Sequence, residues 1–321
     1  MSSGEFDLIA RYFAPLAGAG APAYGLSDDA AILSPPAGYD LIFTKDALVA
    51  GVHFFPDDPA GLVAQKALRV NLSDLAAMGA RPLGYLLALS LPKNMAGIED
   101  WVAGFTSGLK KDQDEFDLSL FGGDTVSTSG PLTLSVTAIG TVPKGGALRR
   151  NGALAGEDIY VSGTLGDGAL GLKCLKDNID NPSLIKNYLL PTPRLALGQK
   201  LSGIASSALD ISDGLAGDIT HICALSGLGA TIDAELIPVS DAAGKLLESF
   251  PAYNDLIWNG GDDYELLFTA PEHMADEIKD VSASLMLPLT KIGHMTEKPG
   301  IVILDDKGKN LLQGQRGYRH F

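Results

Sequence analysis

Short apolar runs and amphipathic stretches alternate along the first half of the chain, which is typical of a mixed α/β protein. Residues 132–139 read Leu-Thr-Leu-Ser-Val-Thr-Ala-Ile, and this strict alternation predicts a half-buried strand. Residues 61–78 have helical spacing and end at Gly79, a residue suited to the position after a helix. The same reasoning predicts strands at 40–43, 85–91, 118–121 and 132–142, and helices at 61–78 and 98–111.

The α/β pattern restarts after residues 143–156, a stretch rich in Gly and basic residues and poor in apolar ones. We therefore expect two domains, 1–148 and 149–321, and a chain of 321 residues is long enough for two cores. The second half predicts strands at 158–162, 208–211, 230–237 and 266–269, helices at 168–175, 195–204, 215–225 and 271–285, and a terminal hairpin at 301–311.

Composition narrows the classes of partner. The formal net charge is −15, which makes the chain a poor candidate for sequence-independent binding to nucleic acid or to anionic lipid. The longest apolar run is far shorter than the roughly 20 residues of a membrane span, and the first residues carry charges where a signal peptide would be apolar. We expect a cytoplasmic protein without membrane contact.

Aspartate dominates the acidic residues, with 29 Asp against 10 Glu. Six segments place Asp at an expected strand or helix end: 27–30, 44–46, 71–74, 122–125, 210–214 and 260–264. An Asp after two glycines is more often a turn former than a ligand, and Asp213 reads equally well as a helix cap. Asp74 differs, because it lies inside a helical pattern on the same face as Asn71, where a carboxylate needs a partner such as a cation.

Several aspartates that converge would repel one another unless a multivalent cation neutralised them. Sites built from carboxylate oxygens favour Mg²⁺ or Mn²⁺ over zinc, and Mg²⁺ favours phosphate chemistry because it bridges phosphate oxygens. The chain has neither a GxxxxGK[ST] loop nor the kinase HRD and DFG motifs. If it binds ATP, it does so through another fold.

The ordered motifs carry a resemblance that covers nearly the whole chain. They are Gly-Glu-Phe at 4–6, Ser-Asp-Asp-Ala at 27–30, Asp-Ala-Leu-Val-Ala-Gly-Val-His-Phe at 46–54, Asn-Leu-Ser-Asp-Leu-Ala-Ala-Met-Gly-Ala at 71–80, Gly-Gly-Asp-Thr at 122–125, Asp-Ile-Ser-Asp-Gly-Leu at 210–215, Gly-Gly-Asp-Asp-Tyr-Glu-Leu at 260–266 and Gly-Tyr-Arg-His-Phe at 317–321. The chain resembles the thiamine-monophosphate kinase family, a branch of the superfamily that includes aminoimidazole ribonucleotide synthetase and selenophosphate synthetase.

The resemblance implies direct transfer of the γ-phosphate of ATP to thiamine monophosphate, with several Mg²⁺ ions. It also implies an N-terminal α/β domain that binds metal and ATP and whose strands join those of a second copy in a homodimer barrel. A C-terminal α/β domain would cover the nucleotide. Because a phosphate nucleophile is already deprotonated near neutral pH, we assign no general base.

The same resemblance implies a set of site residues, taken over position by position. The implied metal positions are Asp29, Thr44, Lys45, Asp46, Asp74, Asp124, Asp210 and Asp213. The implied ATP positions are Thr106, Gly123, Asp124, Arg150 and Ser212. The implied substrate positions are His53, Asp262 and Tyr318.

The chain departs from the family pattern at three positions. Ser27 replaces a usual Gly, Lys45 replaces a usual Thr, and Thr106 replaces a common aromatic residue. At Lys45 either the carbonyl serves the metal or one contact is lost. Taken without the resemblance, His53 reads as a core histidine and Arg150 as half of a solvated pair with Arg149.

Two rival functions remain at this point. One is a sibling ATP-dependent synthetase of the aminoimidazole ribonucleotide type. A selenophosphate enzyme would need a reactive N-terminal Cys or Sec, whereas the first cysteine here is Cys174. The other rival is a non-catalytic metal or nucleotide sensor, which a turnover assay with ATP distinguishes from an enzyme.

Overall fold

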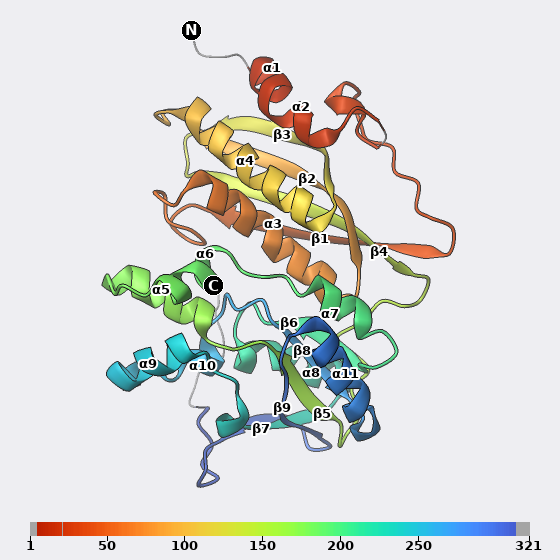
Figure 1. The fold of residues 1–321 in the computed structure, drawn as a ribbon, viewed down its shortest axis with the longest axis vertical. Helices are drawn as coiled ribbons and strands as arrows, with labels where there is room; N and C mark the ends of the chain where they lie inside the picture. The colour runs from red at the N-terminus through yellow and green to blue at the C-terminus, as the bar shows by residue number, and fades with distance from the viewer. Residues whose placement is uncertain (1–4, 21, 313–321) are drawn as a thin grey trace. The chain divides into compact units, whose positions relative to one another are not determined.

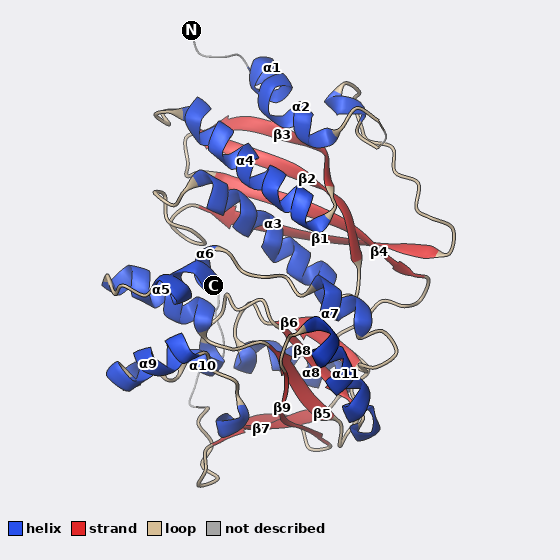
Figure 2. Cartoon of the chain, viewed as in Figure 1, coloured by secondary structure: helices blue, strands red, loops and turns tan. Residues whose placement is uncertain are grey.

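The computed structural model describes residues 5–20 and 22–312, and these fall into two compact units. Unit 1 comprises Met1–Leu75 and Ala80–Gly145, and unit 2 comprises Ala76–Gly79 and Gly146–Phe321. Each unit has its own β-sheet and its own helices (Figures 1 and 2). The mixed α/β class predicted from the hydrophobic pattern is confirmed.

Unit 1 is built on a four-stranded sheet in the order β1-β4-β2-β3. Its strands are β1 (Tyr39–Val49), β2 (Arg81–Pro92), β3 (Ser119–Thr128) and β4 (Thr133–Pro143). Strands β2 and β3 run parallel, and the other neighbours run antiparallel. Two long helices, α3 (Ala60–Ala77) and α4 (Ile98–Phe116), lie across one face of the sheet (Figure 1). The short helices α1 (Glu5–Leu8) and α2 (Ala14–Ala17) precede β1.

The two faces of this sheet differ in polarity and exposure. Along β2, Leu87, Leu89 and Leu91 are buried, whereas the alternating Leu86 and Ala88 are exposed. Because side chains alternate between the faces of a strand, one face forms the core with α3 and α4 and the other stays open. The open face carries large exposed apolar side chains, with Phe43 at 61%, Val126 at 47% and Leu86 at 40% exposure.

Unit 2 contains a six-stranded sheet in the order β10-β7-β9-β5-β8-β6. Its strands are β5 (Asp158–Ser162), β6 (Ser207–Asp210), β7 (Gly229–Asp233), β8 (Leu266–Ala270), β9 (Leu289–Thr296) and β10 (Gly300–Leu304). Its helices are α5 (Asp167–Asp177), α6 (Pro182–Leu189), α7 (Leu195–Lys200), α8 (Leu215–Ser226), α9 (Asp241–Ser249), α10 (Leu256–Asn259) and α11 (Ala275–Leu285). Every residue of β5, β6 and β8 is buried, so both faces of the sheet are covered along these strands.

The structure corrects two expectations about where strands end. Strand β1 continues to Val49, so Thr44, Lys45 and Asp46 lie within it rather than at its end. Strand β3 continues to Thr128, so Gly122–Thr125 is strand rather than turn. Glycine fits there because a Cβ at position 123 would lie 2.0 Å from the Leu87 carbonyl oxygen of the neighbouring strand. The unpredicted elements include β9 and helices α6, α9 and α10.

Candidate functional site

The core face of unit 1 holds two carboxylates from different elements. Asp46 comes from β1 and Asp74 from α3, and we call these two residues the acidic pair. The Thr44 hydroxyl donates to the Asp74 carboxylate, and the Asp46 backbone N–H donates to Asn71 Oδ1 at 3.1 Å. Asn71 in turn donates to the carbonyl of Ala67 at 2.9 Å, so the helix fixes its amide. Helical spacing predicted that Asn71 and Asp74 share a face, and both contact β1.

The electrostatics of the acidic pair favour a bound cation. Burial, and to a smaller extent the neighbouring charge of Asp74, raise the pKa of Asp46 to about 6. A like-charge pair in a desolvated place is costly unless a proton or a cation neutralises it. Carboxylate and hydroxyl oxygens are hard ligands of the kind that Mg²⁺ prefers. The residues present therefore fit the metal that the sequence implied.

Asp124 lies on the opposite face of the same sheet. The register aligns Ala47 of β1, Ser135 of β4, Ala88 of β2 and Asp124 of β3 in one row across the strands. Residues in such a row share a face, and Ala47, Ala88 and Asp124 are all exposed. Asp46 and Asp124 thus occupy opposite faces and opposite edge strands of the sheet.

Two further implied metal residues of unit 1 lie at the surface. Lys45 is exposed on the open face, and Asp29 is exposed in a bend before β1. Within residues 5–20 and 22–312, no three His, Cys, Asp or Glu side chains are grouped closely enough to hold one ion. The expected convergence of several aspartates stays a prediction.

Three further implied residues of unit 1 have clear local roles. His53 follows β1, and its Nδ1 accepts the backbone N–H of Val49 at 3.0 Å, which fixes the ring. Thr106 is buried in α4, and its hydroxyl donates to the Val102 carbonyl at 2.9 Å. Its side chain faces the core, so the structure gives no support to an adenine contact at this position. Gly123 provides the close strand contact described above.

In unit 2, a tight turn links β6 to α8. Asp210 ends β6 and is buried, Ser212 is exposed, and the chain enters α8 after Asp213. Asp218, inside α8, accepts the backbone N–H groups of both Ser212 and Asp213 at 3.0 Å. Burial raises the pKa of Asp218 to about 7. Sequence analysis missed Asp218, although an acid in the first turn of a helix that follows an Asp-Gly turn is a recognisable signal.

The Gly-Gly-Asp-Asp-Tyr-Glu segment lies beside this turn. The Asp262 backbone N–H donates to the Ser212 carbonyl at 2.9 Å, and the Tyr264 N–H donates to the Ile211 carbonyl at 2.8 Å. A Cβ on Gly261 would lie 2.2 Å from the Ser212 oxygen, so only glycine permits the approach. The structure therefore brings the implied substrate residue Asp262 next to the implied ATP residue Ser212.

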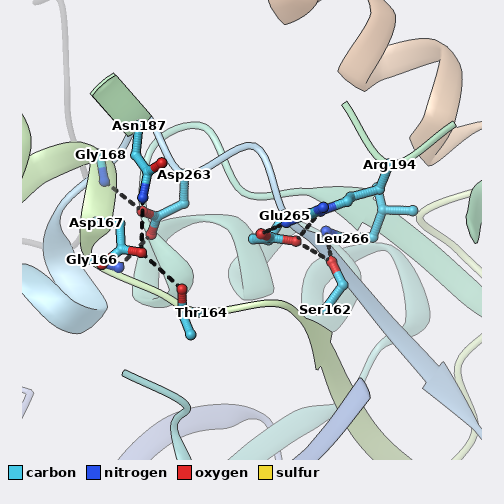
Figure 3. Close-up of polar contacts among 10 residues, drawn as sticks. All are labelled: Ser162, Thr164, Gly166, Asp167, Gly168, Asn187, Arg194, Asp263, Glu265 and Leu266. Atoms are coloured by element: carbon cyan, nitrogen blue, oxygen red, sulfur yellow. Dashed lines mark hydrogen bonds and ion pairs between the residues drawn. The ribbon is translucent and has the colours of Figure 1, made fainter. Parts of the chain in front are cut away.

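Asp263 and Glu265 of this segment lie near Asp167 of α5 (Figure 3). We call these three residues the carboxylate network. Asp263 accepts the backbone N–H groups of Gly166 and Gly168, at 2.7 and 3.0 Å. Burial raises the pKa of Asp263 well above its usual value. The sequence motif at 260–266 included Asp263 and Glu265 but gave none of the three carboxylates a role, because their partners lie far away along the chain.

The other two members of the carboxylate network are held by side chains. Arg194 donates to both oxygens of Glu265 through Nε, at 2.7 Å, and Nη2, and the Ser162 hydroxyl donates to the same carboxylate. Asp167 accepts the hydroxyls of Thr164 and Ser240 and the amide of Asn187. Each of the three carboxylates thus faces at least two N–H or O–H donors.

Two implied residues remain to be placed. Arg150 belongs to unit 2, is exposed, and lies close enough to Asp218 to oppose the rise of that pKa. Tyr318 lies outside the described residues. No helix within residues 5–20 and 22–312 is both long and apolar enough to cross a membrane.

Comparison with known proteins gives matches over most of the chain. Residues 27–142 match the family model for the N-terminal domain of AIR synthase related proteins, and residues 155–306 match that for the C-terminal domain. The thiamine-monophosphate kinase of Escherichia coli K12 is 44% identical over 332 residues, which covers 100% of this chain and 99% of that protein. The corresponding kinase of Bacillus subtilis is 33% identical, with 99% of each chain covered.

Solved structures agree with these relatives. The crystal structure of thiamine-monophosphate kinase from Stenotrophomonas maltophilia K279a matches with a TM-score of 0.82 and 44% identity, covering 89% of this chain and 90% of that one. A structure described as AaThiL complexed with AMPPCP and TMP matches with a TM-score of 0.80 and 29% identity, covering 99% and 97%. The similarity therefore extends through both units.

Proposed function

Since the chain belongs to the thiamine-monophosphate kinases of the AIR synthase related family, we propose that it transfers the γ-phosphate of ATP to thiamine monophosphate with Mg²⁺ at the acidic pair. The observation that carries the reaction is the full-length identity to kinases of this name, together with the related structure that holds AMPPCP and TMP. The metal assignment is supported by the mutual repulsion of the partly buried carboxylates of Asp46 and Asp74.

The reaction joins two anionic phosphates. An oxygen of the substrate phosphate forms a bond to the γ-phosphorus as the bond from that phosphorus to the β-bridging oxygen breaks, which yields thiamine diphosphate and ADP. The acceptor oxygen is deprotonated near neutral pH, since the second pKa of such a phosphate is about 6. The protein therefore has to align two anions and offset their charge rather than remove a proton.

The residues of unit 1 would hold the cation. Asp46 and Asp74 would offer carboxylate oxygens, and Thr44 orients Asp74 by donating to it. Bound Mg²⁺ supplies positive charge that neutralises the phosphates in the ground state and the transition state. Further ligands proposed from the family pattern are Asp29, the carbonyl of Lys45, Asp124, Asp210 and Asp213.

The nucleotide and substrate residues are assigned by the same pattern. We assign Gly123, Asp124, Arg150 and Ser212 to ATP. Arg150 would donate a fork of N–H groups to phosphate. We assign His53, Asp262 and Tyr318 to thiamine monophosphate. Support for Asp262 comes from its position directly beside Ser212. The reaction consumes ATP, and for that reason we expect it to take place in the cytoplasm.

The open face of the unit 1 sheet supports a homodimer. Phe43, Leu86 and Val126 are large apolar side chains exposed on this one face, and exposed apolar groups gathered on a soluble protein mark interaction sites. Asp124 lies on this face, away from the acidic pair, so a single ion cannot reach both within one sheet of this register. We propose that the sheets of two copies close into a barrel and that Asp124 of one copy serves the site of the other. A monomeric mass at assay concentration would contradict this arrangement.

The decisive experiment is an incubation of the purified chain with ATP, Mg²⁺ and thiamine monophosphate, followed by measurement of thiamine diphosphate and ADP. We expect equimolar products, complete loss of turnover with EDTA, and recovery on addition of Mg²⁺. Full turnover without a divalent cation would overturn the metal assignment while leaving the reaction standing. ATP hydrolysis without thiamine diphosphate would overturn the reaction itself.

A further inference from the structure

Asp262 and Tyr264 have an unusual backbone conformation. Their φ angles are +67° and +54°, in the left-handed region that side-chain-bearing residues rarely adopt. The other such residues in the described chain lie at the ends of α4, α5 and α11 or in the short helix at 24–26. Asp262 and Tyr264 instead lie on either side of Asp263 in a segment that leads into β8, so helix termination does not explain them.

The surrounding contacts hold this conformation in place. The backbone N–H groups of Asp262 and Tyr264 donate to the carbonyls of Ser212 and Ile211. Between and after them, the carboxylates of Asp263 and Glu265 are anchored in the carboxylate network (Figure 3). Strained backbone persists only where several contacts determine it, and it concentrates at functional sites. The anchors come from residues 263 and 265, and the strained residues are 262 and 264.

The consequence is a specific side-chain contact. The Tyr264 hydroxyl donates to Asp262 Oδ1 at 3.1 Å, and both side chains are partly exposed. A carboxylate that accepts a hydrogen bond from a neighbouring hydroxyl loses rotational freedom, so its orientation is restricted. We infer that Tyr264 is a positioning residue, which orients the Asp262 carboxylate toward the cationic, N–H-bearing part of the substrate. This inference rests on the proposed assignment of Asp262 to thiamine monophosphate.

The test removes only the hydroxyl. In the full-length protein, we expect Tyr264→Phe to raise the KM for thiamine monophosphate about tenfold, the lower end of the effect of losing one hydrogen bond to a charged group. The KM for ATP and the melting temperature should not change, because the ring and the backbone anchors remain. The matched control is Tyr253→Phe, which removes a hydroxyl that donates to Asp177 at 2.6 Å elsewhere in unit 2 and should leave both KM values unchanged.

A double-mutant cycle with Asp262→Ala shows whether Tyr264 acts through Asp262. We expect Asp262→Ala alone to raise the KM for thiamine monophosphate, and Tyr264→Phe to add nothing further in the double variant. Fully additive effects would overturn the inference, as would equal increases in both KM values or a lowered melting temperature for Tyr264→Phe.

The failure of the inference and that of the proposed site are distinguishable. If Asp262→Ala raises the KM for thiamine monophosphate and Tyr264→Phe does not, the inference is wrong and the assignment of Asp262 stands. If neither variant changes that KM while the wild-type chain turns over, both the assignment and the inference are wrong.

Discussion

The acidic pair of unit 1 and the carboxylate network of unit 2 both contain partly or fully buried carboxylates, but the charge is offset differently in the two. In the network, Asp167, Asp263 and Glu265 each face two or more N–H or O–H donors. In the acidic pair, the influences on the pKa of Asp46 are burial and the like charge of Asp74, and both raise it. The carboxylates of the network accept hydrogen bonds from several donors within the protein, whereas the repulsion within the acidic pair is relieved by a proton or a cation.

The largest expected effect comes from breaking the acidic pair. Asp74→Asn keeps the size of the side chain and removes one charge, so we expect kcat to fall about a hundredfold or more because phosphate charge is no longer offset. Without metal, the melting temperature should stay equal or rise, since the repulsion between Asp46 and Asp74 is relieved. Steady-state kinetics and thermal unfolding in EDTA measure the two quantities.

A surface acid of the same unit provides the control for that experiment. Asp114 pairs with Lys110 on the exposed side of α4, and Asp114→Asn should change neither kcat nor the melting temperature noticeably. Near-normal turnover of Asp74→Asn would show that Asp74 is only a helix-face acid that accepts from Thr44.

The next effect concerns stability in the carboxylate network. Arg194→Ala leaves the carboxylate of Glu265, 7% exposed, without its charged partner, and we expect the free energy of unfolding to fall by about 2 kcal/mol. This expected loss of stability is smaller than the roughly 3–5 kcal/mol that follows from breaking a fully buried ion pair, because the Arg194 side chain is 22% exposed. The matched control is Arg81→Ala, whose partner Asp117 is exposed, and it should cost about 0.5 kcal/mol or less by urea denaturation. Equal costs would remove the distinction between buried and surface pairs.

The local sequence pattern was enough to predict that Asp74 of the acidic pair shares a helix face with Asn71. Asn71 and Asp74 lie three residues apart in a strongly helical stretch, so their shared face followed from helix geometry alone. The turn from Asp210 to α8 was also found, because strand, Asp-Gly and helix follow one another directly. Helical boundaries and acidic motifs are encoded by neighbouring residues.

The carboxylate network depends on contacts between distant residues, which the local sequence pattern does not contain. Asp263 accepts from Gly166 and Gly168, and Glu265 accepts from Arg194, which are all many residues away along the chain. Strand ends were misplaced for a related reason: Gly122 and Gly123 read as a turn, but the neighbouring backbone of β2 makes them strand residues. Tertiary neighbours decided both cases, and the opposite faces of Asp46 and Asp124 emerged only from the strand register.

The last expected effect is a dependence of stability on pH. It distinguishes a buried carboxylate that accepts backbone N–H groups, Asp263, from a surface carboxylate in an ion pair, Asp177. The pKa of Asp263 is raised above its usual 3.8 by burial, so the folded protein binds that proton more tightly than the unfolded chain. Its contribution to the free energy of unfolding is therefore largest below the usual pKa and declines as pH rises above it. Asp263→Asn removes this titration and also one backbone hydrogen bond, and the lost bond adds an offset that does not vary with pH.

We expect the stability of the wild-type chain relative to Asp263→Asn to decline as pH rises above the usual pKa of 3.8, measured by urea denaturation in EDTA. Asp177→Asn is the control of opposite sign, because the hydrogen bonds from Lys173 and Tyr253 lower the pKa of Asp177. The contribution of Asp177 to stability is present above the usual pKa and is lost only as pH falls below it. The difference in stability between the wild-type chain and Asp177→Asn should therefore not vary with pH above the usual pKa. If the difference in stability between the wild-type chain and Asp263→Asn also does not vary with pH, the two backbone N–H donors outweigh burial. The pKa of Asp263 would then not be raised, unlike that of Asp46.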